Sequence, residues 1–531
     1  MAQDRQKYPI SMKRLKILLL YPEVPLTFWS LTHALKFFGK RAYSPPLGLL
    51  TVAALLPKHF ERRVKDLNVQ PLEPSDLAWA DFVFLSAMDV QRASARRILD
   101  RCNRAGVKVV AGGPLFTNGT KDFADVDHLV LNEAELTLPA FLEDLAQGRP
   151  GGRYATAGYA PLEESPRPAY ELIDFSPYGA LSVQYSRGCP YQCDFCNVTT
   201  LFGRRPRVKS AGQVIAELDG IYRLGWRGKI YFVDDNLMCD KGHLKAEVLP
   251  AIIQWKRGKP GLSFHTQITI NLADDQELME LMYEAGFDWV FIGIETPEEE
   301  SLSECGKRQN LHRNLPEQVR RLHRAGLQVQ GGFIVGFDHD SPEVFRRQFR
   351  LIQDNGIVMA MVGLLQAPAG TPLYARLEQE GRILGDISGS NDIDETNFVT
   401  RMDGEVLRRN YRDLVRALYE PRNYYNRIRN LLAHYKEPSQ KPVLTREAVV
   451  GVARCFFWLG LVRRGRFHFW RVLLWTCLFK RESVQTFLGL AILGYHFRRT
   501  YDEMARAPIG SNRTQPSGTP FAPLNRPILK S

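Results

Sequence analysis

The sequence predicts an α/β fold in three parts: an N-terminal doubly wound parallel sheet, a central (β/α)6 partial barrel and a helical C-terminal region. One observation is that two stretches of the chain alternate strand-like with helix-like runs, on either side of a segment rich in Gly and Pro. Another is that the strand-like runs are almost continuously apolar, as in parallel sheets buried on both faces. The length of 531 residues allows several such domains.

Residues 15–150 are expected to form the doubly wound sheet. Strand-like runs occur at residues 16–22, 63–68, 81–88, 107–114 and 128–135. Helix-like runs occur at residues 47–57, 90–106 and 136–148. Strands that alternate with helices in this way predict one parallel sheet with helices on both faces. Such sheets bind ligands beyond the carboxyl ends of their strands.

Residues 151–180 are expected to be a linker, because they are rich in Gly, Pro and Ala and show little periodicity. The alternation resumes in residues 181–400. Six strand-like runs occur there, at residues 181–186, 229–235, 262–268, 288–295, 328–337 and 358–366. Six β/α units predict a partial barrel whose functional loops follow the carboxyl ends of the strands.

Residues 401–506 are expected to be helical and basic, and residues 507–531 to be a disordered tail. Residues 401–531 contain 24 Lys or Arg against 9 Asp or Glu, a net charge of +15, whereas residues 1–400 sum to −3. The near-neutral remainder argues against nucleic acid as a partner, and the basic end predicts an anionic neighbouring surface.

The stretch 451–500 mixes Phe, Trp and Leu with basic residues. Arg463, Arg471 and Lys480 interrupt it, so it holds no run of 18 uncharged apolar residues and a membrane span is not expected. Two interpretations remain open. The stretch is either an interfacial helix that contacts a membrane peripherally, or a helical cap docked on the barrel.

The cysteines and the N-terminus predict a cytoplasmic protein. Five of the eight cysteines are scattered singly, which suits reduced thiols. The first apolar run soon meets Pro22 and Glu23 and has no small-residue cleavage site. We therefore interpret it as a first strand rather than a signal peptide.

Three cysteines, Cys189, Cys193 and Cys196, follow the first barrel strand with the spacing C-x3-C-x2-C. A structural zinc site uses four protein ligands, and the next cysteine, Cys239, belongs to another β/α unit. A cubic iron–sulfur cluster has four irons, so three thiolates leave one iron open to an exogenous ligand. The spacing therefore predicts a [4Fe–4S] cluster that acts on a small molecule.

This motif, with the aromatic Phe195 before the last cysteine and a partial barrel behind it, resembles the radical S-adenosylmethionine (SAM) enzymes. The resemblance implies that the open iron chelates the amino and carboxylate groups of SAM. Reductive cleavage of SAM then yields a 5′-deoxyadenosyl radical, which abstracts hydrogen from a substrate. The SAM contacts that the resemblance implies are Phe195, Asp234, Asp235, Asn236, Glu295, Gly332 and Ile334.

Most of these assignments have a structural alternative. Asp234, Asp235 and Asn236 carry acceptor oxygens for the methionine ammonium, but an acidic turn after a strand is also an ordinary helix cap. Glu295 ends an apolar strand, so it is either a site residue or half of a salt bridge. The glycines around Gly332 would let backbone approach the adenine, and would equally serve a tight turn.

Short motifs at the strand ends of residues 15–150 resemble the cobalamin-binding domain that precedes many radical SAM barrels. Ser86, Gly112 and Gly113 are the cobalamin contacts that the resemblance implies, because small residues let the corrin lie against backbone. The Asp-x-His-x-x-Gly motif, whose histidine ligates cobalt, is absent. The sequence Asn-Glu-Ala-Glu at residues 132–135 replaces Gly-Glu-x-Glu. The alternative is a domain that only supports the barrel.

The whole layout resembles the B12-binding radical SAM family with a helical C-terminal region. The resemblance implies an enzyme that transfers methyl groups to an unactivated carbon of a small or lipid-like substrate, a hopanoid being one such substrate. A [4Fe–4S] cluster, SAM and cobalamin would carry the chemistry, and flavodoxin or ferredoxin would supply electrons. No catalytic residue beyond the cluster ligands is assigned.

Three other functions stay open at this point. One is a radical SAM reaction that forms or rearranges a ring without methyl transfer. Another is RNA modification, which the near-neutral core disfavours. The last is a non-catalytic iron–sulfur sensor.

Overall fold

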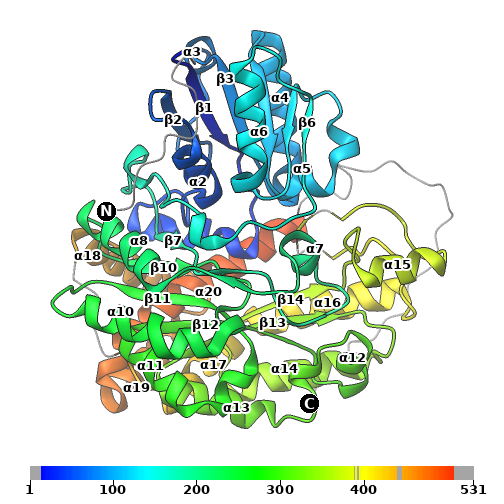
Figure 1. Ribbon diagram of the computed structural model, residues 1–531. Coiled ribbons are helices and arrows are strands. Elements are labelled where there is room, and N and C mark those ends of the chain that lie inside the picture. Colours follow the sequence, from blue (N-terminus) through cyan, green and yellow to red (C-terminus); the bar gives the residue numbers. More distant parts are fainter. Residues whose placement is uncertain (1–12, 388, 391–393, 439–444, 507–531) are drawn as a thin grey trace.

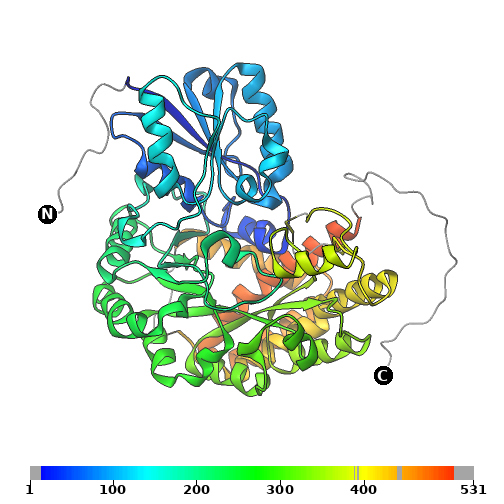
Figure 2. The same cartoon turned by 45° about the vertical axis from the view of Figure 1, so that its right-hand side comes forward.

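The computed structural model describes residues 13–387, 389–390, 394–438 and 445–506. An N-terminal lobe stands over a partial barrel, and the C-terminal helices pack against the barrel (Figures 1 and 2). Two six-stranded parallel sheets followed by helices confirm the expected fold class. The expected tail at residues 507–531 lies outside the described residues.

The N-terminal sheet has the strand order β2-β1-β3-β4-β5-β6, and all neighbours are parallel. Its strands are β1 (Lys16–Tyr21), β2 (Glu61–Asp66), β3 (Phe82–Ser86), β4 (Lys108–Gly112), β5 (His128–Val130) and β6 (Arg153–Tyr154). The short β6 lies inside the segment expected to be a linker, so the sheet extends past residue 150.

Helices cover both faces of this sheet because successive side chains of a strand point to opposite sides. Ile17 and Leu19 face the core under α2 (Leu47–Leu55) and α6 (Ala134–Ala146). Leu18 and Leu20 face the other core, under α3 (Pro74–Trp79), α4 (Arg92–Ala105) and α5 (Pro114–Asn118). A ligand of this sheet is therefore expected beyond the ends of its strands rather than on its covered faces.

The second sheet has the strand order β14-β13-β12-β11-β10-β7, again with parallel neighbours. Its strands are β7 (Ala180–Val183), β10 (Lys229–Phe232), β11 (Ser263–Ile268), β12 (Phe287–Glu295), β13 (Gln328–Val335) and β14 (Met359–Leu364). The intervening helices are α8 (Ala211–Arg223), α10 (Leu249–Lys256), α11 (Gln276–Ala285), α13 (Leu315–Ala325) and α14 (Glu343–Asp354). Because β7 and β14 end the strand order, the barrel is open between them.

Several short elements follow the carboxyl ends of the barrel strands. The antiparallel pair β8 (Ser186–Arg187) and β9 (Arg207–Val208) encloses α7 (Val198–Phe202). Helix α12 (Glu299–Glu304) follows β12, and α15 (Pro372–Gln379) follows β14. These elements surround the cysteine motif.

The C-terminal region is helical, as expected. It comprises α16 (Gly404–Tyr419), α17 (Pro421–His434), α18 (Arg446–Cys455), a π-helical segment (Phe456–Val462), α19 (Arg466–Phe479) and α20 (Val484–Arg506). These helices share one hydrophobic core with the barrel, and the hydroxyls of Tyr411 and Tyr419 on α16 donate to backbone carbonyls of β14 at 3.1 and 2.6 Å. Among the residues that the structure describes, no helix is long and apolar enough to cross a bilayer.

Candidate functional site

The three cysteines lie in one loop, residues 188–197, between β8 and α7. Gly188 begins this cysteine loop with φ of +91°, and a Cβ there would lie 3.0–3.2 Å from three backbone carbonyls. The Asp194 amide donates to the Cys305 carbonyl at 3.1 Å, and the Asp194 carbonyl accepts from the Leu373 amide at 3.0 Å. The loop is therefore tied to the end of α12 and the start of α15.

The donor set fits a [4Fe–4S] cluster. All three thiols are free and partly exposed. Burial raises the pKa of the Cys196 thiol to about 12, so the thiolates need positive charge beside them. In the part of the chain that the structure describes, no three His, Cys, Asp or Glu side chains are grouped to hold a single metal ion. In a [4Fe–4S] cluster, three thiolates would bind three different irons rather than one ion.

A buried lysine supplies positive charge at the cysteines. Lys307 Nζ lies 2.6 Å from Glu295 Oε1. Burial alone would lower the pKa of Lys307, but Glu295, Cys193 and Cys196 raise it. Gln309 Nε2 donates to Cys193 Sγ at 3.8 Å. Neither Lys307 nor Gln309 could be recognised from the sequence, because both lie more than 100 residues from the cysteines and in no spacing motif.

Glu295 is therefore half of a salt bridge and also adjoins the cysteine loop. It has φ of +63°, at a register shift in β12. A Cβ at Gly293 would lie 2.3 Å from its carboxylate. A glycine and a left-handed backbone together turn this carboxylate toward Lys307.

Of the three polar residues after β10, Asp234 and Asn236 make hydrogen bonds within the protein. Asp234 is fully buried and accepts hydrogen bonds from the Tyr185 amide at 3.2 Å and the Ser186 hydroxyl at 2.5 Å. Asn236 is buried and caps the following turn. Asp235 is partly exposed, and burial together with Asp234 raises its pKa to about 7. Asp234 thus holds the backbone that enters the cysteine loop.

The remaining SAM candidates lie close to one another. Phe195 and Ile334 pack against one hydrophobic cluster, which contains Cys305 and Phe337. Gly332 shares a face of β13 with Ile334, because the two are separated by one residue. A Cβ at Gly332 would lie 2.7 Å from the Phe291 ring. Packing alone therefore accounts for glycine at this position.

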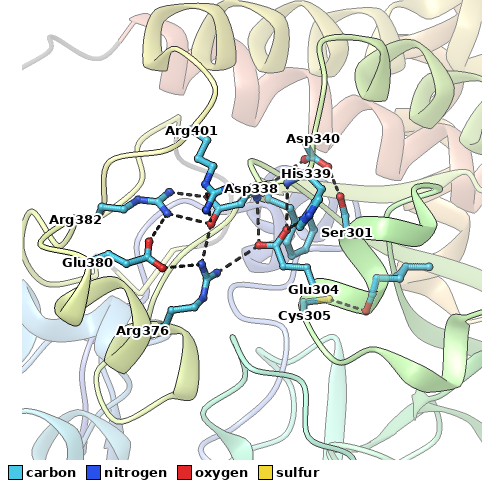
Figure 3. Close-up of polar contacts among 12 residues, drawn as sticks. Ser301, Glu304, Cys305, Asp338, His339, Asp340, Arg376, Glu380, Arg382 and Arg401 are labelled. Carbon is cyan, nitrogen blue, oxygen red and sulfur yellow. Dashed lines mark hydrogen bonds and ion pairs between the residues drawn. The ribbon is translucent and has the colours of Figure 1, made fainter.

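Figure 3 shows a charged network that joins the end of α12 to the segment after β13 and to α15. Asp338 accepts from Arg376 at 2.8 Å and from Arg382 at 2.7 Å, and Arg401 lies 3.6 Å away. Glu304 pairs with Arg376 and with His339. Since Glu304 directly precedes Cys305, the network holds the segment that carries the loop's hydrogen-bond acceptor.

Asp338→Asn is expected to lower the stability of the protein by about 2 kcal/mol at neutral pH. Burial alone would raise the pKa of Asp338, but Arg382 and Arg376 lower it to about 2. A lowered carboxyl pKa stabilises the fold above the unfolded pKa, and this stabilisation disappears as the pH falls from about 4 to about 2. Thermal unfolding of wild type and variant across this range measures it.

The difference between the thermal unfolding midpoints of wild type and Asp338→Asn should shrink as the pH falls toward about 2. Asp413→Asn is the matched control, because that exposed carboxylate only approaches Arg416 at 3.9 Å. A difference that is the same at pH 7 and at acidic pH would contradict the role of the Asp338 charge.

In the N-terminal lobe, the three cobalamin candidates meet at the carboxyl edge of the sheet. Ser86 ends β3 and Gly112 ends β4. A Cβ at Gly112 would lie 2.5 Å from the Val130 carbonyl oxygen, and one at Gly113, where φ is +91°, would lie 2.7 Å from Ser86 Oγ. The close approach of neighbouring strand ends requires glycine at both positions.

Two acidic residues of the Asn-Glu-Ala-Glu motif bind the antiparallel pair of β8 and β9, which flanks the cysteine loop and which we call the cysteine hairpin. Glu133 accepts from both terminal nitrogens of Arg207 at 2.7 Å, and Glu135 accepts from Arg187 at 2.8 Å. All four side chains are at most 15% exposed. We call these pairs the Glu–Arg clamp. Arg187 directly precedes Gly188, so the clamp joins the N-terminal lobe to the start of the cysteine loop.

Comparison with known proteins assigns families to all three parts. A model described as the B12 binding domain matches residues 41–142, and one described as the Radical SAM superfamily matches residues 183–352. Residues 371–508 match a domain of unknown function.

Two full-length relatives are similar to this chain. An uncharacterized methyltransferase of Synechocystis sp. is 34% identical, over 93% of this chain and 94% of the relative. Hopanoid C-2 methylase of Rhodopseudomonas palustris is 31% identical, over 91% of this chain and 92% of the relative. Among solved structures, the cobalamin-dependent SAM radical enzyme OxsB aligns with a TM-score of 0.61 at 14% identity, over 93% of this chain and 80% of that one.

These matches confirm the expected enzyme class and its three cofactors: a [4Fe–4S] cluster, SAM and cobalamin. With a B12-binding domain ahead of a radical SAM barrel and a relative 34% identical over nearly its whole length, the chain belongs to the B12-binding radical SAM family of methyltransferases.

Proposed function

We propose that this enzyme transfers a methyl group to an unactivated carbon of a lipid-like substrate of the hopanoid type. The Glu–Arg clamp carries this proposal, because it ties the sheet edge expected to bind cobalamin to the loop expected to bind the cluster. A methyl donor and a radical source must meet at one substrate. The name of the relative hopanoid C-2 methylase supports the choice of substrate class.

Cys189, Cys193 and Cys196 would hold the cluster, and Lys307 would offset the negative charge of their thiolates. When bound, the cluster and SAM supply a 5′-deoxyadenosyl radical, and cobalamin supplies the methyl group. Lys307 also offers its ammonium to the SAM carboxylate, and the partly exposed Asp235 offers its carboxyl to the SAM ammonium.

The remaining SAM and cobalamin contacts are proposed from how these side chains pack in the protein. Phe195, Gly332 and Ile334 would contact the adenosyl group, and Asp234, Asn236 and Glu295 would orient the residues that touch SAM. Ser86, Gly112 and Gly113 would lie against cobalamin. The domain boundaries near residues 180, 400 and 506 belong to the same proposal, whereas the N-terminal sheet extends past residue 150 to β6.

The proposal includes two partners outside the chain. Flavodoxin or ferredoxin would deliver the electron that cleaves SAM. A cytoplasmic location with peripheral membrane contact through residues 451–500 would bring the enzyme to a lipid-like substrate.

The reconstituted enzyme should form 5′-deoxyadenosine and S-adenosylhomocysteine in equal amounts under anaerobic conditions. Each methylation consumes one SAM for the radical and another for the methyl group. The assay contains reductant, cobalamin, SAM and a hopanoid in detergent micelles, and both products are followed by mass spectrometry. Omission of cobalamin is the control, and it should remove S-adenosylhomocysteine. Formation of 5′-deoxyadenosine alone, with cobalamin and hopanoid present, would contradict methyl transfer to this substrate class.

A further inference from the structure

The outward face of α19 is apolar although it lies on the molecular surface. Phe467, Leu478 and Phe479 are 76%, 74% and 69% exposed, and Trp470 and Leu474 are also exposed. The opposite face of the helix is buried in the protein. A helix that is apolar on both sides normally has both sides covered, so the outward face lacks its cover in the isolated chain.

The neighbouring elements extend this apolar face. Exposed hydrophobic side chains also lie on the π-helical segment and on α18; they are Phe457, Trp458, Leu461, Val462, Val449 and Val450. With α19, this region holds eleven of the eighteen exposed large hydrophobic side chains among the described residues. We call it the α19 face. Scattered apolar residues are ordinary on a protein surface, but such a concentration marks an interaction site.

The charge around the α19 face is predominantly positive. Residues 446–482, from the start of α18 to just past α19, contain eight Lys or Arg against two Glu. Arg464 and Arg466 lie at the start of α19, and Lys480 and Arg481 lie at its end. Cations at both ends of an apolar helix suit a helix that lies flat at a lipid surface, with its ends at the level of the phosphates.

A pocket of about 440 Å³ adjoins this region at Trp458. Its other walls include Lys36, Arg454 and Arg499. The Arg454 guanidinium is held in place by the backbone carbonyls of Lys36 and Phe37, at 3.0 Å each. Arg499 is partly neutralised by Glu503 at 2.8 Å. The pocket therefore adds positive charge where an acidic headgroup would lie.

The dimensions exclude a membrane span for this helix. Helix α19 has 14 residues and a length of about 21 Å, against about 30 Å for the hydrocarbon core of a bilayer. We propose that the α19 face docks on the surface of an anionic lipid bilayer. This inference rests on the proposed peripheral location, but it does not depend on the proposed chemistry.

The test is flotation of the full-length protein with vesicles, without SAM or substrate. Wild type should float with phosphatidylcholine vesicles that contain about 30 mol% phosphatidylglycerol, and binding should fall at about 0.5 M salt. The double substitution Phe467→Glu and Leu478→Glu should weaken binding at least about tenfold, because it would place two carboxylates at the boundary between the lipid headgroups and the acyl chains. Leu384→Glu, at a residue 68% exposed outside the face, is the matched control and should bind as wild type does.

A second variant tests the charges. Arg464→Gln with Arg466→Gln should reduce binding to anionic vesicles and leave the weak binding to pure phosphatidylcholine unchanged. Circular dichroism and cleavage of SAM check that each variant is folded, and neither depends on vesicles. Failure of wild type to float, or equal flotation of the double glutamate variant and Leu384→Glu, would overturn the proposal. So would sedimentation showing that wild type is a dimer and the glutamate variant a monomer, because a second copy would then cover the face.

Discussion

Cys193→Ala is expected to abolish formation of both 5′-deoxyadenosine and S-adenosylhomocysteine. Cys193 is the middle thiol of the loop, it accepts from Gln309 Nε2 at 3.8 Å, and its charge helps to raise the pKa of Lys307. Removal of one of three cluster ligands leaves a second iron without protein ligation, so the site no longer presents one open iron to SAM. Both products should fall to the level of the reaction without enzyme.

The control for this experiment is Cys477→Ala, which replaces an exposed cysteine outside the loop and should keep wild-type turnover. Iron content and the visible absorbance of the cluster should fall in Cys193→Ala and stay normal in Cys477→Ala. Turnover retained in Cys193→Ala, with iron bound, would show that this thiol is not a required ligand.

Glu133→Gln is expected to lower the free energy of unfolding by about 3 kcal/mol. It is also expected to uncouple methyl transfer from the cleavage of SAM. Glu133 is buried and makes two charge-assisted hydrogen bonds to Arg207. Loss of its charge leaves the Arg207 guanidinium buried without its carboxylate, which costs more than the loss of an exposed pair. The N-terminal lobe then loses a tether to the cysteine hairpin.

Thermal unfolding measures the first effect, and the ratio of S-adenosylhomocysteine to 5′-deoxyadenosine measures the second. That ratio should fall severalfold, because cleavage of SAM needs only the barrel. Methyl transfer also needs the N-terminal lobe to be held in the correct position relative to the barrel. The matched control is Asp125→Asn, since Asp125 and Arg96 form an exposed pair at 3.0 Å, and it should cost less than about 0.5 kcal/mol. An unchanged product ratio in Glu133→Gln would show that the clamp only stabilises the fold.

Much of the architecture could be predicted because its signals are local. Continuous apolar strands and amphipathic helices alternate within short windows, and they predicted both sheets and all six barrel strands in order. The three cysteines are equally local, since eight residues contain the whole motif. Even the glycines at residues 112 and 113 were expected at a strand end, although the structure explains them by strand packing.

The site beyond the cysteines depends on contacts between distant segments. Glu295 and Asp234 could each be a ligand or a structural group by sequence, and their partners Lys307 and Ser186 became visible only in three dimensions. The Glu–Arg clamp joins residues 52 and 74 positions apart. A charged residue shows its type in the sequence, but its partner depends on how the whole chain folds.

In the C-terminal region too, some properties follow from the local sequence and others from the tertiary structure. Composition and charge determined that it is helical and basic, because helix periodicity and net charge are properties of a short stretch of residues. Whether it caps the barrel or contacts a membrane surface was open from the sequence; in the folded chain one side of α19 is buried in the core and the other is exposed. The sequence specifies which side chains are apolar, but the packing of the other helices decides which of them remain uncovered.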